Sequence, residues 1–250
     1  MLKRNVMIGA AVAVMSCGAM VSTQALEVIN LTHLSTVGER VTATWSDLAP
    51  GGYSGSVRAK VGKFIMRDNA TRERLEAFCT DVGVKLQNTW NYTPIADPVG
   101  AGLAGVVPPG PAWRDGGWEA ASYLISQVSL TANSVNMAGL QVALWEVLYD
   151  GNYSLSEGRF KATSEVAGVI PAALNYLAIA AGADGSGNAV WLAPLANVNG
   201  PIASQAEDQF RVGGSQGLIT QVPDGGVTLL LLGLGFGGLA LFQNRARRRA

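Results

Sequence analysis

Residues 136–150 read NMAGLQVALWEVLYD, a stretch that predicts a helix ending at Gly151. A polar residue, Gln141, lies in the middle of this stretch. Its helical neighbours at positions i−4, i−3, i+3 and i+4 are Met137, Ala138, Leu144 and Trp145. All four are apolar, so Gln141 lies on a stripe of the helix that should face the core.

A primary amide in a core must find hydrogen-bond partners, or it costs about 1–3 kcal/mol of stability. Three interpretations of Gln141 are open: main-chain groups satisfy it, it lines a polar pocket, or its amide has reacted. The third interpretation needs a nucleophile, and Cys79 is a candidate. A cysteine thiolate attacks the glutamine carbonyl carbon, expels ammonia and leaves an internal thioester, provided that the two groups are held together away from water.

The elements on either side of this helix predict an α+β fold. Strands are expected within residues 26–67, at 27–32, 40–45 and 53–66, and again at 74–84, which carries Cys79. A helix is expected from Trp118 to Val128, with Asp115 as its cap, and a helical region at 163–181 is interrupted at Pro171. A last strand is expected at 189–195. We therefore expect an antiparallel β part, a sandwich or barrel, with a helical insertion.

Cysteine and histidine counts limit the chemistry. The chain has two cysteines, Cys17 and Cys79, and one histidine, His33. These cannot build a zinc site, so we expect no metal and no cofactor. A Ser-His-Asp hydrolase would have to use His33, and the letters of a nucleophile elbow at 213–217 lack a strand-turn-helix context. The protein is not expected to be an enzyme.

The N-terminus predicts export. Lys3 and Arg4 precede an apolar run at 6–15, and Thr23-Gln24-Ala25 is a small-residue cleavage site. Residues 1–25 are thus expected to be a signal peptide cleaved after Ala25. Cys17 leaves open the alternative of a lipidated N-terminus.

The C-terminus predicts an anchor. The motif Val222-Pro223-Asp224-Gly225-Gly226 precedes an uncharged apolar run at 227–242 and four arginines, at 245, 247, 248 and 249. We expect 227–242 to span the inner membrane as a helix, with the basic tail in the cytoplasm. An ordinary single-span anchor is the simpler alternative. The domain prediction is a globular body at 26–211, a polar spacer at 212–221 and a sorting signal at 222–250.

Export changes the charge of the chain. The whole sequence has 18 basic and 18 acidic residues, but six of the basic residues and one acidic residue lie in the two removable ends. The mature part, residues 26–222, then carries a net charge of about −5. A negative net charge argues against nucleic acid as a partner.

Residues 222–250 resemble the PEP-CTERM sorting signal of Gram-negative bacteria, in its VPD-Gly variant. This chain has Asp224 where the family core has Glu, and Gly225 where it has the second Pro. The resemblance implies that an exosortase cuts near the motif. The protein would then be held briefly at the inner membrane before it reaches the cell surface or the extracellular space.

Two motifs in the body resemble the Cys-Gln thioester domains of bacterial surface adhesins. Phe78-Cys79-Thr80-Asp81 is similar to their aromatic-Cys-x-Asp motif, and residues 140–145 are similar to their Gln-x-Ala-aliphatic-Trp helix, with Leu140 where that family has Thr. The resemblance extends over residues 53–195. It implies that Cys79 and Gln141 form the thioester, which an amine on a surface target would open to give a covalent attachment.

Two functional hypotheses follow. The first is a covalent adhesin or matrix protein that reacts through a Cys79–Gln141 thioester. The second is a non-reactive structural or carbohydrate-associated component of the extracellular polysaccharide matrix, with Cys79 as a buried thiol. Both hypotheses share the same export route.

Overall fold

The computed structural model describes residues 28–48, 53–82, 84, 86–96, 98, 113–183, 185, 187–195 and 215–221. The predicted signal peptide, the sorting motif and the membrane span at 227–242 lie outside the described residues. Among the described residues, no helix is long and apolar enough to cross a membrane.

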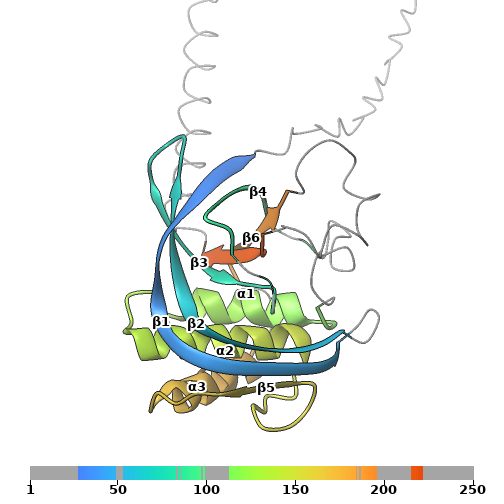
Figure 1. Ribbon diagram of the computed structural model, residues 1–250. Helices are drawn as coiled ribbons and strands as arrows, with labels where there is room; N and C mark the ends of the chain where they lie inside the picture. Colours follow the sequence, from blue (N-terminus) through green and yellow to red (C-terminus); the bar gives the residue numbers. More distant parts are fainter. Residues whose placement is uncertain are drawn as a thin grey trace, which may run out of the picture.

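The β part is an antiparallel sheet that closes on itself (Figure 1). Its strands are β1 (Ile29–Leu48), β2 (Tyr53–Asp68), β3 (Arg74–Cys79), β4 (Thr89–Ile95), β5 (Phe160–Thr163), β6 (Ala189–Pro194) and β7 (Leu218–Gln221). The order is β2-β3-β7-β6-β4-β1-β5, and β2 also pairs with β1, so six strands form a ring and β5 lies outside it. The expected antiparallel β part with a helical insertion is therefore present, and the ring makes it barrel-like.

The long hairpin of β1 and β2 departs from the two separate strands expected at 27–32 and 40–45. β1 is one strand of 20 residues, and Gly38 pairs with Gly62 in its middle. A Cβ atom on Gly38 would lie 1.8 Å from the carbonyl oxygen of Val61. The two glycines thus let the backbones approach closely, so the hairpin continues where the sequence suggested an interruption.

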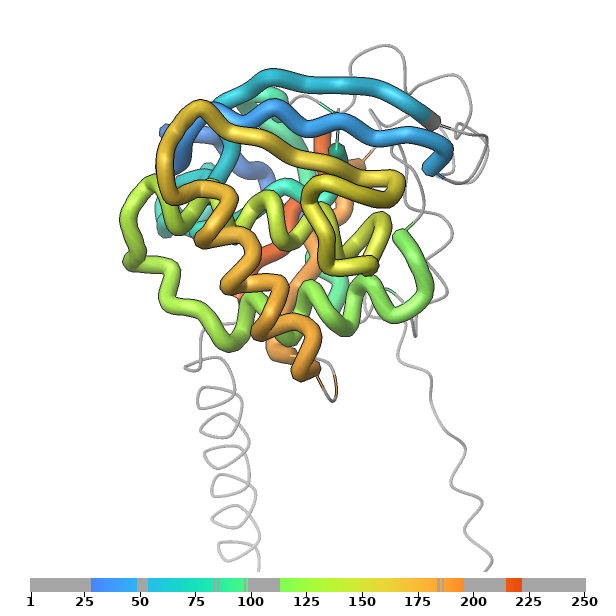
Figure 2. Tube along the Cα trace, turned by 90° about the horizontal axis from the view of Figure 1, so that it is seen from below, coloured from blue at the N-terminus to red at the C-terminus, as the bar shows by residue number. Residues whose placement is uncertain are grey.

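The described residues form three helices, α1 (Gly117–Gln127), α2 (Ser134–Tyr149) and α3 (Val169–Ala181), of which α2 packs against the hairpin. Figure 2 shows β1, β2 and β5 side by side across the helices. α2 contacts both strands of the hairpin as well as α1 and α3. It is buried on every side from Met137 to Tyr149 and mostly apolar, as expected for a helix inside a core.

Helix boundaries follow local chemistry with two departures from expectation. Asn133 caps α2 by accepting a hydrogen bond from the main-chain N–H of Asn136 at 2.9 Å. Asp115 does not cap α1, because the N-cap residue is Gly116 and no side chain bonds to the helix end. Pro171 does not interrupt α3 but lies in its first turn, where a missing N–H costs no helical hydrogen bond.

A polar spacer was predicted at 212–221, and this prediction is wrong for the residues of that segment that the structure describes. Residues 218–221 form β7, which pairs with both β3 and β6 and completes the ring. Leu218 and Ile219 have no exposed surface. These two apolar residues are a strand signal too short to stand out beside their glycine-rich and polar neighbours.

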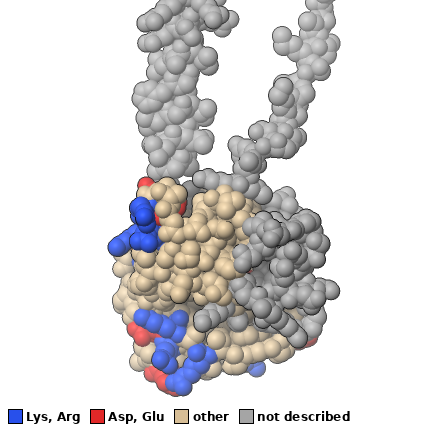
Figure 3. Space-filling model, turned by 45° about the horizontal axis from the view of Figure 1, so that its top comes forward, with Lys and Arg blue, Asp and Glu red and all other residues tan. Residues whose placement is uncertain are grey.

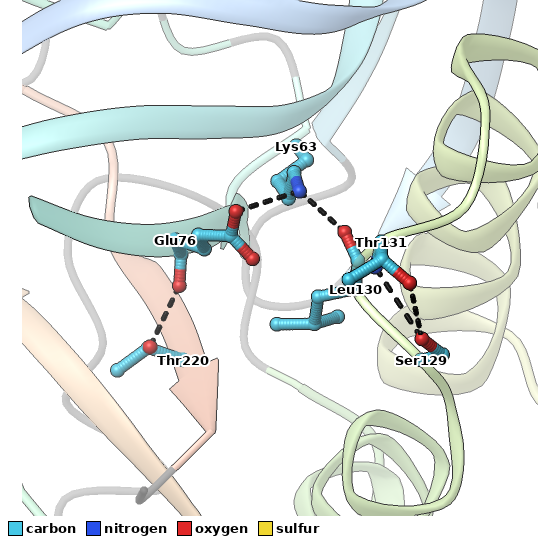
Figure 4. Close-up of polar contacts among 6 residues, drawn as sticks. All are labelled: Lys63, Glu76, Ser129, Leu130, Thr131 and Thr220. Atoms are coloured by element: carbon cyan, nitrogen blue, oxygen red, sulfur yellow. Dashed lines mark hydrogen bonds and ion pairs between the residues drawn. The ribbon is translucent and has the colours of Figure 1, made fainter.

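A buried lysine fastens the β part to the connection between α1 and α2 (Figure 4). Lys63 on β2 forms an ion pair with Glu76 on β3 at 2.7 Å, and it donates a hydrogen bond to the carbonyl oxygen of Leu130. Its side chain is 8% exposed. One ammonium group therefore holds two strands and a helix connection together.

On the face shown in Figure 3, most of the described charged side chains lie in two groups, at the upper left and the lower left, with uncharged surface between them. Only 14% of the whole sequence is charged. A partner for the described part of this face would therefore meet mainly uncharged groups.

Candidate functional site

The site is built around Cys79, the last residue of β3. β3 pairs with β7 so that Cys79 lies opposite Leu218. Just beyond the strand, the N–H of Thr80 donates to the carbonyl oxygen of Gly217 at 2.9 Å. The residues that follow Cys79 therefore run beside the residues that precede β7, although the two segments are more than 130 positions apart in the sequence.

Gln141 reaches Cys79 from α2, as the sequence predicted, but it contacts the main chain. Its Oε1 accepts a hydrogen bond from the N–H of Cys79 at 2.8 Å, and its Nε2 donates to the carbonyl oxygen of Cys79 at 2.8 Å. Both functions of the carboxamide are thus occupied by one residue's backbone. Gln141 is fully buried, so this pair of bonds satisfies a polar group that the core would otherwise penalise.

The thiol of Cys79 faces a different glutamine, Gln216. The sulfur lies 2.5 Å from Oε1 of Gln216 and 3.0 Å from the carbonyl oxygen of Asp81. The thiol donates a hydrogen bond to this carboxamide oxygen. Cys79 is 2% exposed and Gln216 is 3% exposed. The thiol and this carboxamide are therefore in direct, water-poor contact.

Further hydrogen bonds hold the two segments in place. The carboxylate of Asp81 accepts a bond from the N–H of Gly217, and Tyr149 on α2 donates to the carbonyl oxygen of Thr80 at 2.7 Å. The hydroxyls of Tyr92 and Ser215 are 2.9 Å apart. These bonds hold the main chain on either side of Cys79 and Gln216, so they fix the positions of both residues.

Burial governs the protonation of the site. Burial raises the pKa of the Cys79 thiol well above its ordinary range, and the nearby Asp81 carboxylate adds to this shift. Burial also raises the pKa of Asp81 to about 7, against the hydrogen bond from Gly217. The thiol is therefore neutral at rest, and a carboxyl group that changes charge near neutral pH lies beside it.

A cavity of about 500 Å³ leads to this contact, and Cys79, Asp81, Gln141 and Gln216 contribute to its walls. The other lining residues come mainly from the hairpin of β1 and β2 and include His33 and Phe64. His33 is half-buried, its ring bonds to Thr36 at 3.0 Å and packs edge-on against Phe64. A ligand the size of an amino-acid side chain fits such a volume.

The structure brings together Cys79 and Gln141, the two site residues that the sequence singled out in the body. It adds Gln216, which lies in the segment predicted to be a polar spacer. The signal for Gln216 was the step from polar Ser215-Gln216-Gly217 to apolar Leu218-Ile219, which marks the entry to a buried strand. Within the described residues, no group of three or more His, Cys, Asp and Glu side chains is placed to hold a metal ion.

Comparison with known proteins identifies the end of the chain. Residues 221–249 match the VPDSG-CTERM motif, which supports a PEP-CTERM-type sorting signal. This motif implies processing by an exosortase and is consistent with export and membrane anchoring before surface display. No curated protein and no solved structure matches the chain. The motif thus suggests an exported and sorted surface protein, while the body has no match from which an activity could be carried over.

Proposed function

We propose that the body of this protein forms an internal thioester between Cys79 and Gln216, through which it attaches covalently to an amine-bearing target outside the cell. The observation that carries this proposal is the 2.5 Å contact between the Cys79 sulfur and Oε1 of Gln216. The protein would be consumed by one reaction, so it acts as a covalent adhesin and not as an enzyme.

The bond changes balance without a cofactor. The sulfur attacks the carboxamide carbon of Gln216, the carbon–nitrogen bond breaks, and the thiol proton leaves with the nitrogen as ammonia. Such a step needs a fixed approach of the two groups and the exclusion of water. The pairing of β3 with β7 supports the first condition, and the burial of both residues supports the second.

Gln216 is a better partner than Gln141, which the adhesin resemblance suggested. The Gln141 carboxamide bonds to the N–H and the carbonyl oxygen of Cys79, two main-chain groups that need partners in a core. Reaction of Gln141 would remove its Nε2 and leave the Cys79 carbonyl oxygen without its donor. We therefore assign Gln141 the role of holding the Cys79 backbone, so that the thiol faces Gln216.

The cavity of about 500 Å³ supplies a path for the attacking amine. Its wall contains both Cys79 and Gln216, so a primary amine that enters it meets the thioester carbon directly. Attack by the amine would form an amide with the Gln216 side chain and release the Cys79 thiol. The target would then be joined to the protein through residue 216.

A biotin-linked alkylamine tests this function. The exported protein is incubated with the amine, digested, and its labelled peptide is mapped. We expect one label on residue 216 and none in the Cys79→Ala variant, whereas Gln127→Ala, which changes an exposed glutamine on α1, should label like the parent. No labelling of the folded parent, or labelling that persists in Cys79→Ala, would refute the proposal.

A second function rests on the burial of the thiol. Because the pKa of Cys79 is raised well above its ordinary range, an unreacted thiol would be inert and would pack as a small apolar group. The protein would then be a non-reactive component associated with the extracellular polysaccharide matrix. This alternative predicts a free thiol that titrates only after unfolding.

A further inference from the structure

Only one of the two carboxyl oxygens of Asp81 has a hydrogen-bond partner among the described residues. The residue is fully buried, and its Oδ2 accepts the N–H of Gly217. Its Oδ1 is also buried and has no hydrogen-bond partner among the described residues. A buried polar oxygen without a partner costs stability, and such groups are often retained for a catalytic role.

The position of Asp81 links it to both reacting residues. It is two residues after Cys79, and its main-chain carbonyl oxygen lies 3.0 Å from the Cys79 sulfur. Its carboxylate accepts a hydrogen bond from Gly217, the residue next to Gln216. Asp81 also lines the same cavity as Cys79 and Gln216. The Asp81 side chain therefore lies beside both the Cys79 thiol and the segment that carries the Gln216 carboxamide.

Thioester formation needs a proton to move twice. The thiol must lose its proton to become a nucleophile, and the amide nitrogen of Gln216 must gain one to leave as ammonia. A buried thiol does not ionise readily by itself, because burial raises its pKa. The site thus needs one group that first accepts a proton and then donates it.

The other titratable groups around Asp81 do not fit this role. Tyr149 on α2 and Tyr92 on β4 both interact with Asp81, and burial raises the pKa of each phenol, so both stay protonated. His33 on β1 lines the cavity, but its ring is hydrogen-bonded to Thr36, and burial lowers its pKa.

We propose that the Asp81 carboxylate takes the proton from the Cys79 thiol and delivers it to the departing amide nitrogen of Gln216 as the thioester forms. The carboxylate is regenerated at the end, the carbon–sulfur bond replaces the carbon–nitrogen bond, and ammonia carries away the thiol proton. The inference rests on the proposed thioester. The pKa of about 7 supports it, since a carboxyl group with that value exchanges protons in both directions near neutral pH.

The rate of thioester re-formation tests this role. Concentrated ammonia opens the thioester of the exported protein and restores Gln216 and the Cys79 thiol. Removal of the ammonia starts re-formation, which is followed by loss of one ammonia in mass and by loss of the thiol. The parent rate should rise with pH through about 7 and then level off.

Asp81→Asn keeps the shape of the side chain and an oxygen for Gly217 but cannot carry the proton. We expect re-formation to slow by about 10²-fold or more, the usual contribution of a general acid–base group, with the inflection near pH 7 lost. Glu146→Gln is the matched control. It neutralises another buried carboxyl group with a raised pKa, on α2 and outside the cavity lining, and should leave the rate unchanged.

The outcomes separate the two proposals. A parent protein that never loses ammonia would refute the thioester and this role with it. If the parent forms the thioester and Asp81→Asn re-forms it at the same rate with the same pH profile, the role of Asp81 is wrong while the thioester stands. If Asp81→Asn does not fold, the parent profile decides, because a rate that keeps rising past pH 9 without an inflection near 7 would contradict the role.

Discussion

The carboxamide of Gln141 pairs with both main-chain polar groups of Cys79, at 2.8 Å for each bond. This relationship gives Gln141 and Gln216 different positions relative to Cys79. Gln141 holds the backbone from the helix, and the thiol is left free to face Gln216 from the neighbouring strand. Substitution of the two glutamines should therefore have different effects.

Gln141→Ala should destabilise the fold without removing the cross-link. The substitution leaves the buried N–H and carbonyl groups of Cys79 without partners, at about 1–3 kcal/mol for each group. Urea denaturation measures the loss, and Gln127→Ala on the exposed face of α1 should change the free energy of unfolding by less than about 0.5 kcal/mol. The folded variant should still lose one ammonia. An unchanged stability would contradict the role of Gln141 as a main-chain partner.

Gly217→Ala should reduce the cross-linked fraction. A Cβ atom on Gly217 would lie 2.6 Å from Oγ1 of Thr80, 2.7 Å from Nε1 of Trp191 and 3.1 Å from Oδ2 of Asp81. The added methyl group must push the segment that carries Gln216 away from Cys79, and small displacements of reacting groups slow their reaction strongly.

Mass spectrometry of the purified variant measures this fraction. Gly185→Ala is the matched control, because a Cβ atom there meets nothing within 4 Å and the cross-link should be complete. A Gly217→Ala protein that is as fully cross-linked as the parent would show that the site tolerates the displacement.

Glu146 should make the protein less stable as the pH rises. Burial raises its pKa to about 8 from an ordinary value of 4.5, and the charge of Asp150 adds to the shift. The folded state therefore holds a proton that the unfolded state has released between these pH values. Stability falls across that window by up to about 1.4 kcal/mol per pH unit for one proton and is constant outside it.

Glu146→Gln isolates this effect, because Asp81 titrates in part of the same range in both proteins. We expect the variant to match the parent near pH 5 and to be more stable at pH 9, with a shallower loss of stability between them. Urea denaturation at several pH values measures both curves. Parallel curves for the two proteins would contradict the assignment.

The sorting signal predicts a cut near the motif. In cells with an active exosortase, the protein should lack the C-terminal arginines, and replacement of Pro223 and Asp224 by alanine should preserve the full length. Peptide mapping of the last peptide distinguishes the two forms. A surface form that ends at Ala250 would reduce the segment to a plain membrane anchor.

Much of the fold follows from the sequence because strong periodic signals coincide with the real elements. The apolar stretch at 136–150 predicted α2, and the strand expected at 74–84, which carries Cys79, corresponds to β3. The continuous β1 strand was missed because glycine in a single strand resembles an interruption, whereas Gly38 and Gly62 meet in one pair. That pairing depends on the partner strand, which local sequence does not reveal.

The site was half predictable for a related reason. Gln141 stood out because a polar residue on an apolar helical stripe is a local contrast. Gln216 did not stand out, because its burial arises only when β7 is inserted between β3 and β6. A strand of four residues after a glycine-rich stretch is too short to show the alternation that would predict it from sequence.

The most direct test of the account is the intact mass of the exported protein, with its two ends established by peptide mapping, beside its Gln216→Ala and Gln141→Ala variants. We predict a parent that is lighter than its sequence by one ammonia and has no titratable thiol. Gln216→Ala should have its full mass and one thiol after unfolding, whereas Gln141→Ala should keep the loss. A parent of full mass with a titratable Cys79, or an ammonia loss that survives in Gln216→Ala, would contradict the Cys79–Gln216 thioester.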